Sequence, residues 1–264
     1  MNTYWCKTYN NKNSNFGDIL TPFILDTYKI PYVYGEKDIQ FYGIGSILDG
    51  VIENYNGYVW SSGFLLQPKS KKIFKRAPLA LRGKYSLSCI QYNNAPIALG
   101  DGGLIMSNIY SPKIEKKYKL GIIPHYVDID WGDFDIRTFS VFSTPDVLFI
   151  DPKDTITNYI DKLNSCENIL SSSLHGSVMG DSYKINNSMF QTSISKKSLH
   201  LNKGSYKFKD YFSAFNQPPP ALLDLNEKTT IEECISHCKE FNKPNIDVLK
   251  YYLEKCLKDF KTDE

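Results

Sequence analysis

The chain has 264 residues, of which 42% are hydrophobic and 23% charged, and its formal net charge is +2 at pH 7. This length and apolar content exclude a disordered tail and a small disulfide scaffold, and they predict one large globular domain or two modest ones. The near-neutral charge does not support a nucleic-acid or polyanion binder. Only three of the 31 basic residues are arginines, the side chains best suited to a two-pronged grip on carboxylate or phosphate: Arg76, Arg82 and Arg137.

The six cysteines are spread along the chain without the dense framework of a secreted mini-domain, and residues 4–7 indicate a strand rather than a signal peptide. We therefore expect a cytoplasmic protein with free thiols. Cys234, His237 and Cys238 lie on one predicted helix without a second ligand pair, so we expect no metal there. Every apolar run is shorter than the roughly 18 residues of a membrane span. Contact with a membrane, at its inner face, could only be peripheral.

In chain order, short β-rich runs end in Gly, Ser, Asp or His, and a helix is expected over 20–28. Apolar rather than alternating runs predict strands covered on both faces, as in parallel sheets of α/β proteins. In such sheets ligands collect at the carboxyl ends of the strands, where this chain places its small and polar residues. The runs that we interpret as strands are 3–9, 39–42, 57–60, 79–81, 96–99, 119–123, 146–150 and 167–170.

The recurring β-rich runs are interrupted between residues 126 and 144 by an acidic, turn-rich passage. We interpret this passage as the connection between two α/β units, 1–126 and 127–216. A third segment, 217–264, is predicted to be helical and to pack back on the body. There, Thr230 and Glu233 form a capping box for a helix to about Phe241, and Asn245 can cap a final helix. That last helix places five apolar residues on one face, typical of core packing: Leu249, Leu253, Cys256, Leu257 and Phe260.

The strongest local signal for chemistry is the segment 171–176, where three serines follow a strand and His175 opens a helix. Free backbone N–H groups at a helix start attract an anion, and the hydroxyls of Ser172 and Ser173 can add donors. His175 could then transfer a proton beside that anion. The structural alternative is that the serines only cap the helix. We favour the functional interpretation for this combination.

Other candidates are weaker. Arg82 ends an apolar strand beside a glycine, which favours an anion clamp, whereas His125 at the end of another strand is as well explained by structure as by function. His200 and His237 are expected to be structural. The turn 43–46 lacks the third glycine of a dinucleotide fingerprint, and Asp101 is more simply explained as a turn residue than as a ligand for sugar hydroxyls.

Taken together, eight turns resemble the polysaccharide pyruvyltransferase family, in the same order, over about residues 4–211. No single motif is decisive, but eight in sequence are specific. The turns are Asn15-Phe16-Gly17-Asp18, 43–48, Trp60-Ser61-Ser62-Gly63-Phe64, Leu81-Arg82-Gly83, Leu99-Gly100-Asp101, 123–128, 171–176 and Phe208-Lys209-Asp210-Tyr211. The chain departs from many relatives at Ser61 and in the helix after His175, which affects substrate placement more than reaction class.

This resemblance implies two Rossmann-like units facing across a cleft, like the glycosyltransferase B architecture. It also implies transfer of a pyruvyl group from phosphoenolpyruvate to two hydroxyls of a sugar, giving a cyclic ketal and phosphate. The acceptor would be a capsular, exopolysaccharide or cell-wall glycan, often lipid-linked and in the cytoplasm. In the family, the residues matching Arg82 and His175 serve donor binding and catalysis.

The residues agree with this donor, because its carboxylate and phosphate need an arginine and a helix-terminus or lysine cradle. Arg82 supplies the arginine. The helix terminus is supplied by Ser172, Ser173 and Leu174, and the lysine by Lys207 or Lys209. We expect His175 to act as general acid on the donor's methylene carbon, with His125 or Asp18 deprotonating the sugar. No metal or other cofactor is needed in principle. The remaining expected substrate contacts are Asn15, Gly17, Ser46, Ser62, Gly63 and Asp101.

Two other classes stay open. A nucleotide-sugar glycosyltransferase of the same architecture would usually place an acidic residue in the second unit to hold the ribose, and 171–183 shows no convincing glutamate. A non-catalytic glycan-binding protein would carry exposed rows of aromatic residues, which the 19 tyrosines permit. The sugar, the hydroxyl pair and the oligomeric state do not follow from the sequence.

Overall fold

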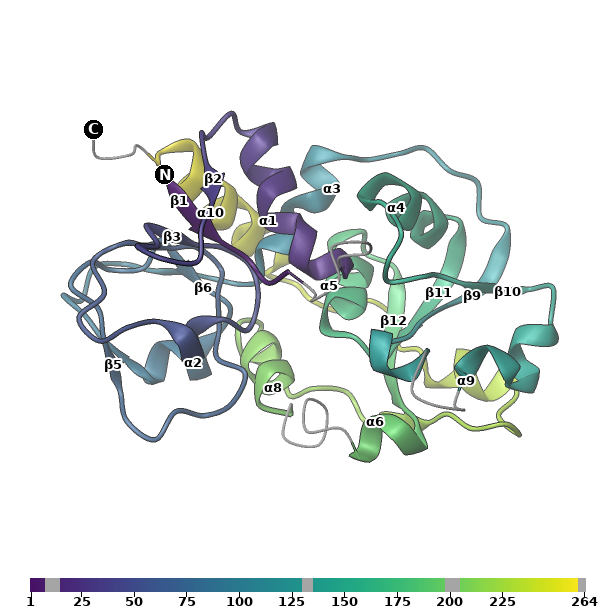
Figure 1. The fold of residues 1–264 in the computed structure, drawn as a ribbon. Coiled ribbons are helices and arrows are strands. Elements are labelled where there is room, and N and C mark those ends of the chain that lie inside the picture. The colour runs from purple at the N-terminus through teal and green to yellow at the C-terminus, as the bar shows by residue number, and fades with distance from the viewer. Residues whose placement is uncertain (8–14, 130–134, 198–204, 261–264) are drawn as a thin grey trace.

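The computed structural model describes residues 1–7, 15–129, 135–197 and 205–260 (Figure 1). It is an α/β protein built on a four-stranded and a five-stranded sheet, with two further two-stranded pairs. Every pairing between the strands that the structure describes is parallel. The predicted α/β class with parallel sheets is therefore confirmed. Part of the acidic passage predicted to connect two units, 130–134, lies outside the described residues.

The four-stranded sheet has the order β2-β1-β3-β4, and single bridges from Ser62 to Gly45 and to Leu81 continue it toward the pair β6–β8. Its strands are short because each ends in a turn that carries small or polar residues. The strands of this half are β1 (Asn2–Tyr4), β2 (Val33–Tyr34), β3 (Phe41–Tyr42), β4 (Tyr58–Val59), β5 (Lys72–Ile73), β6 (Ala80–Leu81), β7 (Ile90–Gln91) and β8 (Ala98–Leu99).

The five-stranded sheet has the order β10-β9-β11-β12-β13. The central strands β9 and β11 pair in a register that sets Ile123 opposite Ser171, so their carboxyl ends meet at the same edge. This register brings the segments that begin at His125 and Ser172 together. The strands are β9 (Tyr118–Ile123), β10 (Val147–Phe149), β11 (Cys166–Ser171), β12 (Asn186–Gln191) and β13 (Leu222–Asp224).

The helices differ from expectation mainly at their ends. The first begins at Phe16, four residues before the predicted start, because Asn15 takes the N-cap position. The segment around Phe208, expected as a turn, is the middle of a helix with a buried face. The helices are α1 (Phe16–Thr27), α2 (Lys84–Ser88), α3 (Met106–Ile109), α4 (Ile156–Asn164), α5 (Leu174–Ser182), α6 (Ser193–Lys197), α8 (Ser205–Ser213), α9 (Ile231–His237) and α10 (Ile246–Lys258).

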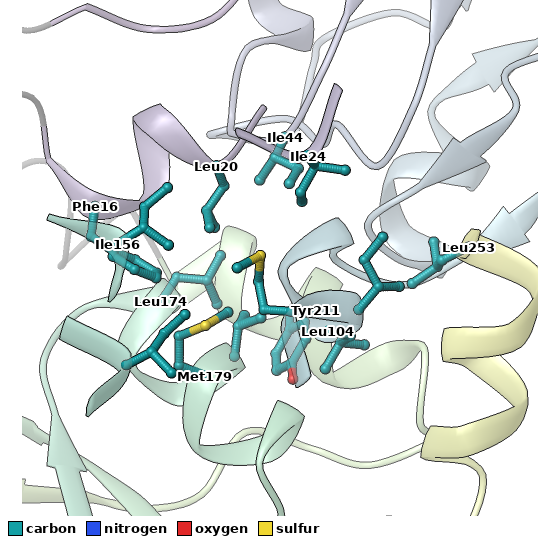
Figure 2. Close-up of a cluster of buried hydrophobic side chains, with 14 of the residues drawn as sticks. Phe16, Leu20, Ile24, Ile44, Leu104, Ile156, Leu174, Met179, Tyr211 and Leu253 are labelled. Atoms are coloured by element: carbon teal, nitrogen blue, oxygen red, sulfur yellow. The ribbon is translucent and has the colours of Figure 1, made fainter. Parts of the chain in front are cut away.

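One continuous cluster of buried apolar side chains joins elements from all three predicted segments. Figure 2 shows Leu20 and Ile24 of α1 facing Met179 of α5, with Leu253 of α10 at one side. Phe16 of α1 stacks on Tyr159 of α4 with ring centroids 3.9 Å apart. Each such buried side chain contributes roughly 1.5–3 kcal/mol. The halves of the chain are therefore held together by a shared core, and the boundaries 1–126, 127–216 and 217–264 stay a prediction.

The C-terminal segment follows the prediction in outline. Both hydrogen bonds of the Thr230–Glu233 capping box are present, but α9 ends at His237, four residues before Phe241, since Cys238 turns to extended backbone. Asn245 precedes α10 without a side-chain cap bond, contrary to expectation. The predicted core face of α10 is confirmed at Leu253, which is fully buried. No helix within the described ranges is long and apolar enough to cross a bilayer.

Candidate functional site

A cavity of 260 Å³ lies where the carboxyl ends of β1, β9 and β11 approach the turn after β3. Polar residues from sequence-distant segments converge on it, as expected for the strand ends of an α/β protein. Nine of the predicted site residues line the cavity: Asn15, Asp18, Ser46, Arg82, His125, Ser173, Leu174, His175 and Lys207. The other lining residues are Cys6, Gly45, Ile47, Leu65 and Tyr126.

The three serines after β11 are engaged in building this edge. Ser171 Oγ donates to the carbonyl of Ile123 at 2.9 Å, and Ser173 Oγ caps α5 by accepting from the Gly176 N–H at 3.0 Å. Ser172 Oγ donates to Asp128 at 2.6 Å and accepts from the backbone N–H of His125 at 2.7 Å. The expected donation of the Ser172 hydroxyl to a ligand is thus replaced by a structural role. The helix start itself, beside Ser173, remains on the cavity.

His175 is held between Gly17 and Asp101. A Cβ on Gly17 would lie 1.8 Å from Nδ1 of His175, so only glycine in α1 allows this ring position. On the other side, Nε2 lies 3.7 Å from Oδ2 of Asp101. Neither atom has a hydrogen-bond partner in the described part of the chain, and both are buried. Asp101 Oδ1 accepts from the Gly103 N–H at 2.9 Å, which fixes the carboxylate.

Burial lowers the pKa of His175 below its usual value, and the charges of Lys207 and Arg82 act in the same direction against the raising effect of Asp101. The imidazole is therefore mainly neutral near pH 7. A proton on Nε2 would face Asp101 and leave Nδ1 as an acceptor, which suits a general base.

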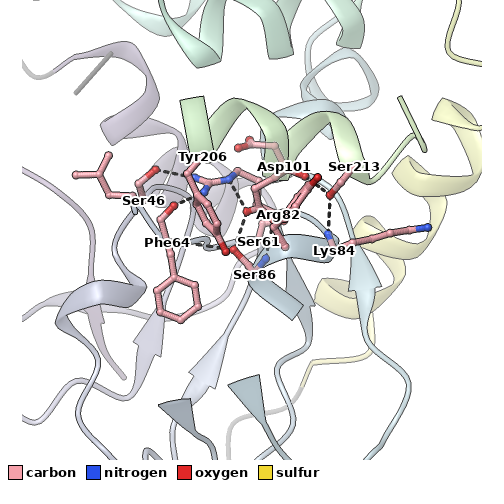
Figure 3. Close-up of polar contacts among 12 residues, drawn as sticks. Ser46, Ser61, Phe64, Arg82, Lys84, Ser86, Asp101, Tyr206 and Ser213 are labelled. Atoms are coloured by element: carbon pink, nitrogen blue, oxygen red, sulfur yellow. Dashed lines mark hydrogen bonds and ion pairs between the residues drawn. The ribbon is translucent and has the colours of Figure 1, made fainter. Parts of the chain in front are cut away.

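Arg82 is fully buried and already engaged (Figure 3). Its Nε donates to Asp210 of α8 at 3.0 Å, Nη1 to Ser46 at 2.6 Å and Nη2 to the Phe64 carbonyl at 2.5 Å. The guanidinium lies against Gly63. Asp210 neutralises this arginine, and its approach to the cavity is beside Ser46. The expected two-pronged grip on a ligand stays a prediction.

Gly83 was expected to give a ligand room to approach. A Cβ there would instead lie 1.7 Å from the backbone oxygen of Asp210. The glycine therefore accommodates α8, not a ligand, and it allows the ion pair between Arg82 and Asp210 to form.

Asp18 and Lys207 form a second pair of titratable groups on the cavity. Burial raises the pKa of Asp18 to about 7, although a hydrogen bond from Asn15 and the charge of Lys207 lower it. Burial and the neighbouring Arg82 lower the pKa of Lys207 to about 8, while Asp18 raises it. Near neutral pH, Asp18 carries a proton about half of the time and Lys207 is mostly a cation. Strongly shifted values in one cavity are typical of functional sites.

His125 lies at the mouth of the cavity with Tyr126. The two rings lie 4.3 Å apart at an angle of 34°, and Tyr126 is 37% exposed. The loop is anchored by Asp128, which accepts from Ser172 and from Thr192 at 2.6 Å each. A buried imidazole and a partly exposed aromatic ring therefore form one wall of the cavity.

Some predicted residues lie away from the cavity. Ser62 is fully buried and donates to the Gly43 carbonyl, so it supports the turn after β3. Lys209 is on the exposed face of α8, opposite Lys207, and lines a different cavity. His237 contacts the Ala221 carbonyl, as a structural histidine would, and His200 lies outside the described residues.

The sequence interpretation missed Cys6, Leu65 and Asp210. Cys6 and Leu65 follow a strand or a strand-end turn, the same signal that identified His125 and Ser173. Asp210 carries no local signal, because its partner Arg82 is 128 residues away. No cluster of three or more His, Cys, Asp or Glu side chains placed to hold a metal occurs among the described residues.

No family model matches the sequence, and no solved structure matches it. An uncharacterized protein of Acanthamoeba polyphaga mimivirus is similar, with 32% identity over 185 residues. The match covers 67% of this chain but only 60% of the relative, so the chain spans less than two thirds of that protein. These comparisons assign neither a family nor an activity.

Proposed function

We propose that this chain is a pyruvyltransferase that moves a pyruvyl group from phosphoenolpyruvate to two hydroxyls of a sugar. The observation that carries the proposal is the meeting of a buried lysine, Lys207, with His175 and the N-terminus of α5 on one small cavity. A cation and a helix start together favour a compact anion, and the imidazole beside them provides a group for proton transfer. The order of motifs that resembles polysaccharide pyruvyltransferases supports the same reaction.

In the proposed complex, the donor phosphate lies between the Lys207 ammonium and the first turn of α5. Lysine acts here as a point charge, and the amide N–H groups of Leu174 and His175 point along the helix axis toward the anion. The donor carboxylate lies toward Ser46, where Nη1 of Arg82 approaches the cavity. Because Asp210 neutralises Arg82, Lys207 provides the main net charge.

The shifted pKa values favour proton-transfer roles that differ from those expected from the sequence. Asp18, whose pKa is raised to about 7, is partly protonated at neutral pH and is proposed as the general acid. His175, whose pKa is lowered, is proposed as the general base, oriented by Asp101. The sequence had predicted the reverse, with His175 as the acid and Asp18 as a possible base. The exchange follows because burial favours the neutral form of both groups, which is the protonated carboxyl and the unprotonated imidazole.

The proposed reaction begins with protonation of the donor and ends with release of phosphate. Asp18 protonates the methylene carbon, and the first sugar hydroxyl adds to the resulting oxocarbenium carbon while His175 takes its proton. The carbon–oxygen bond to phosphate then breaks, and the second hydroxyl adds at the same carbon. The proton of the second hydroxyl leaves on the departing phosphate. His175 returns the proton of the first hydroxyl to Asp18 through solvent. The products are a cyclic ketal and hydrogen phosphate.

The acceptor is proposed to be a surface glycan or its lipid-linked precursor, entering past Tyr126. An exposed aromatic ring at the entrance can pack on the apolar face of a sugar. The same proposal includes a two-unit arrangement like glycosyltransferase B. It also includes a cytoplasmic location, with at most peripheral contact with the membrane.

Phosphate release tests the proposal directly. The purified chain would be incubated with phosphoenolpyruvate and galactosides, glucosides, mannosides or lipid-linked oligosaccharides, and phosphate measured. We expect release with one acceptor class, a loss of at least about 100-fold in His175→Gln, and loss of donor affinity in Lys207→Met. Lys71→Met, at an exposed lysine outside the cavity, is the matched control.

Two outcomes would contradict the proposal. One is unchanged phosphoenolpyruvate affinity in a folded Lys207→Met variant. The other is saturable binding of a nucleotide sugar with no response to phosphoenolpyruvate, which would favour the glycosyltransferase alternative.

A further inference from the structure

A second cavity, more than twice as large, lies on the opposite side of α8 from the candidate site. Its volume is 610 Å³, against 260 Å³ for the candidate site. It opens between α2, α8 and the proline-rich loop after α8. Its lining residues are Lys84, Tyr85, Ser88, Lys209, Ser213, Asn216, Gln217, Pro218 and Pro219.

The lining combines positive charge with hydrogen-bonding side chains. Two exposed lysines line the cavity and no acidic residue does, among the residues that the structure describes. The hydroxyls of Ser88 and Ser213 donate to the carbonyls of Tyr85 and Asp210, so the amides of Asn216 and Gln217 are the neutral groups that can donate to a ligand. Figure 3 shows the Lys84 side chain directed away from Arg82, so its ammonium is separate from the candidate site.

One wall of the cavity is apolar and flat. Tyr85 is 47% exposed, and its ring makes a T-shaped contact with the ring of Tyr206. The ring centroids lie 6.0 Å apart, with an interplanar angle of 65°. Pro218 and Pro219 add rigid apolar surface to the lining. A half-exposed aromatic ring beside hydrogen-bonding groups suits a ligand that has both an apolar face and hydroxyls.

The walls are held in place independently of any ligand. Asp210 of α8 accepts from the Ser86 N–H at 2.8 Å and from the Ser86 hydroxyl at 2.6 Å. The Lys84 N–H donates to Ser213 Oγ at 2.8 Å, and Lys84 Nζ contacts Asn216. Gln217 donates to the Asn242 carbonyl at 2.8 Å. A preformed cavity binds with less loss of conformational freedom.

We propose that this cavity binds an acidic oligosaccharide, with a sugar ring on Tyr85 and its carboxylate or phosphate between Lys84 and Lys209. A saccharide fits better than a peptide, because the lining offers an aromatic ring and side-chain amides rather than deep apolar pockets. Two lysines in a chain of net charge +2 provide too little charge for nucleic acid. Binding here is independent of pyruvyl transfer, so it goes beyond the proposed function.

Calorimetry with defined probes tests this site. Trigalacturonate and mannose 6-phosphate supply the carboxylate and phosphate forms, maltotriose is the neutral saccharide, and triglutamate is the acidic peptide. We expect an acidic sugar to bind, with affinity that falls as salt rises. Binding should fall at least 10-fold in Lys84→Gln/Lys209→Gln and in Tyr85→Ala, and persist in Tyr85→Phe.

The matched control is Lys69→Gln/Lys71→Gln, two exposed lysines outside the cavity, which should leave binding unchanged. Unfolding temperatures check that each variant folds. The proposal is overturned if no acidic sugar binds, if triglutamate or maltotriose binds as tightly, or if the control variant loses as much affinity. Phosphate release from phosphoenolpyruvate is measured separately, so failure of either proposal leaves the other standing.

Discussion

Nε2 of His175 and Oδ2 of Asp101 face each other across 3.7 Å in the interior, and neither has another hydrogen-bond partner in the part of the chain that the structure describes. A buried carboxylate oxygen without a donor is costly unless a nearby proton compensates. The pair therefore selects the imidazole form with its proton on Nε2. This relationship was not expected, because Asp101 was interpreted as a turn residue, with contact to sugar hydroxyls as the alternative.

Asp101→Asn should weaken this orientation without disturbing the fold, because Asn keeps an oxygen that can accept from Gly103. We expect the pKa of His175 to fall further, since the Asp101 charge raises it. Turnover in the proposed reaction should fall by about 10- to 100-fold, with a smaller change in KM. The imidazole signals in an NMR titration measure the pKa. An unchanged titration curve for His175 would mean that the two residues do not interact.

Gly17→Ala should displace the His175 ring, because the new methyl group would lie 1.8 Å from Nδ1. In a solvent-exposed helix the same change usually stabilises by about 0.5–1 kcal/mol. Here we expect loss of activity and no gain in stability. Gly50→Ala, where no atom lies within 4 Å of the added Cβ, is the control. Full activity in Gly17→Ala would show that the ring position is not needed.

Asp210→Ala should leave the fully buried Arg82 without its carboxylate partner. Removing one member of a buried pair typically costs about 3–5 kcal/mol. Urea denaturation measures the loss. Asp146→Ala breaks the exposed pair with Lys119, where both side chains are at least 41% exposed, and should cost less than about 1 kcal/mol. Equal losses in the two variants would contradict the importance of burial.

Asp18→Asn should stabilise the fold, and more so at high pH. The folded-state pKa of Asp18 is raised to about 7 from 3.8, so the folded state binds the proton more tightly than the unfolded state. Stability from this group is present below pH 4 and is lost as the pH rises through 7. We expect a gain of about 1–3 kcal/mol at pH 8 and little at pH 4. A gain that is the same at both pH values would point to another cause.

The proposed reaction should have a bell-shaped pH profile. Its acid limb reports protonation of His175 and should lie below pH 6.5, because the pKa of that residue is lowered. Its alkaline limb should begin near pH 7 and steepen near pH 8, as Asp18 and then Lys207 lose their protons. The measurement is kcat/KM between pH 5 and 9. Activity that rises steadily up to pH 9 would exclude Asp18 as the acid.

The sequence predicted the elements whose signal is local. Strand β9 and the start of α5 were placed to within a residue, because an apolar run followed by small and polar residues marks the end of a buried strand. The register of β9 with β11 explains why His125 and Ser172 meet. The serine turn caps the helix, as the structural interpretation predicted, and Ser173 also lines the cavity, so the functional interpretation stays a prediction.

Contacts between distant segments could not be predicted in this way. Nothing near Arg82 indicates that α8 will supply Asp210, so the sequence predicted the place of this arginine on the cavity but not its buried ion pair. Lys207 and Lys209 are equivalent in sequence, and only the helical path of α8 decides that the first faces the candidate site. The same holds for the pKa values, which depend on burial that only tertiary packing creates.

The last helix also has a consequence for how the chain is made. Trp60, near the carboxyl end of β4, is fully buried and donates from Nε1 to the carbonyl of Leu253 in α10 at 3.1 Å. During synthesis the N-terminal half leaves the ribosome long before residue 253 is available. The indole of Trp60 therefore stays without this partner until α10 has been synthesised, so the core of the first half is completed by a residue 193 positions later in the chain.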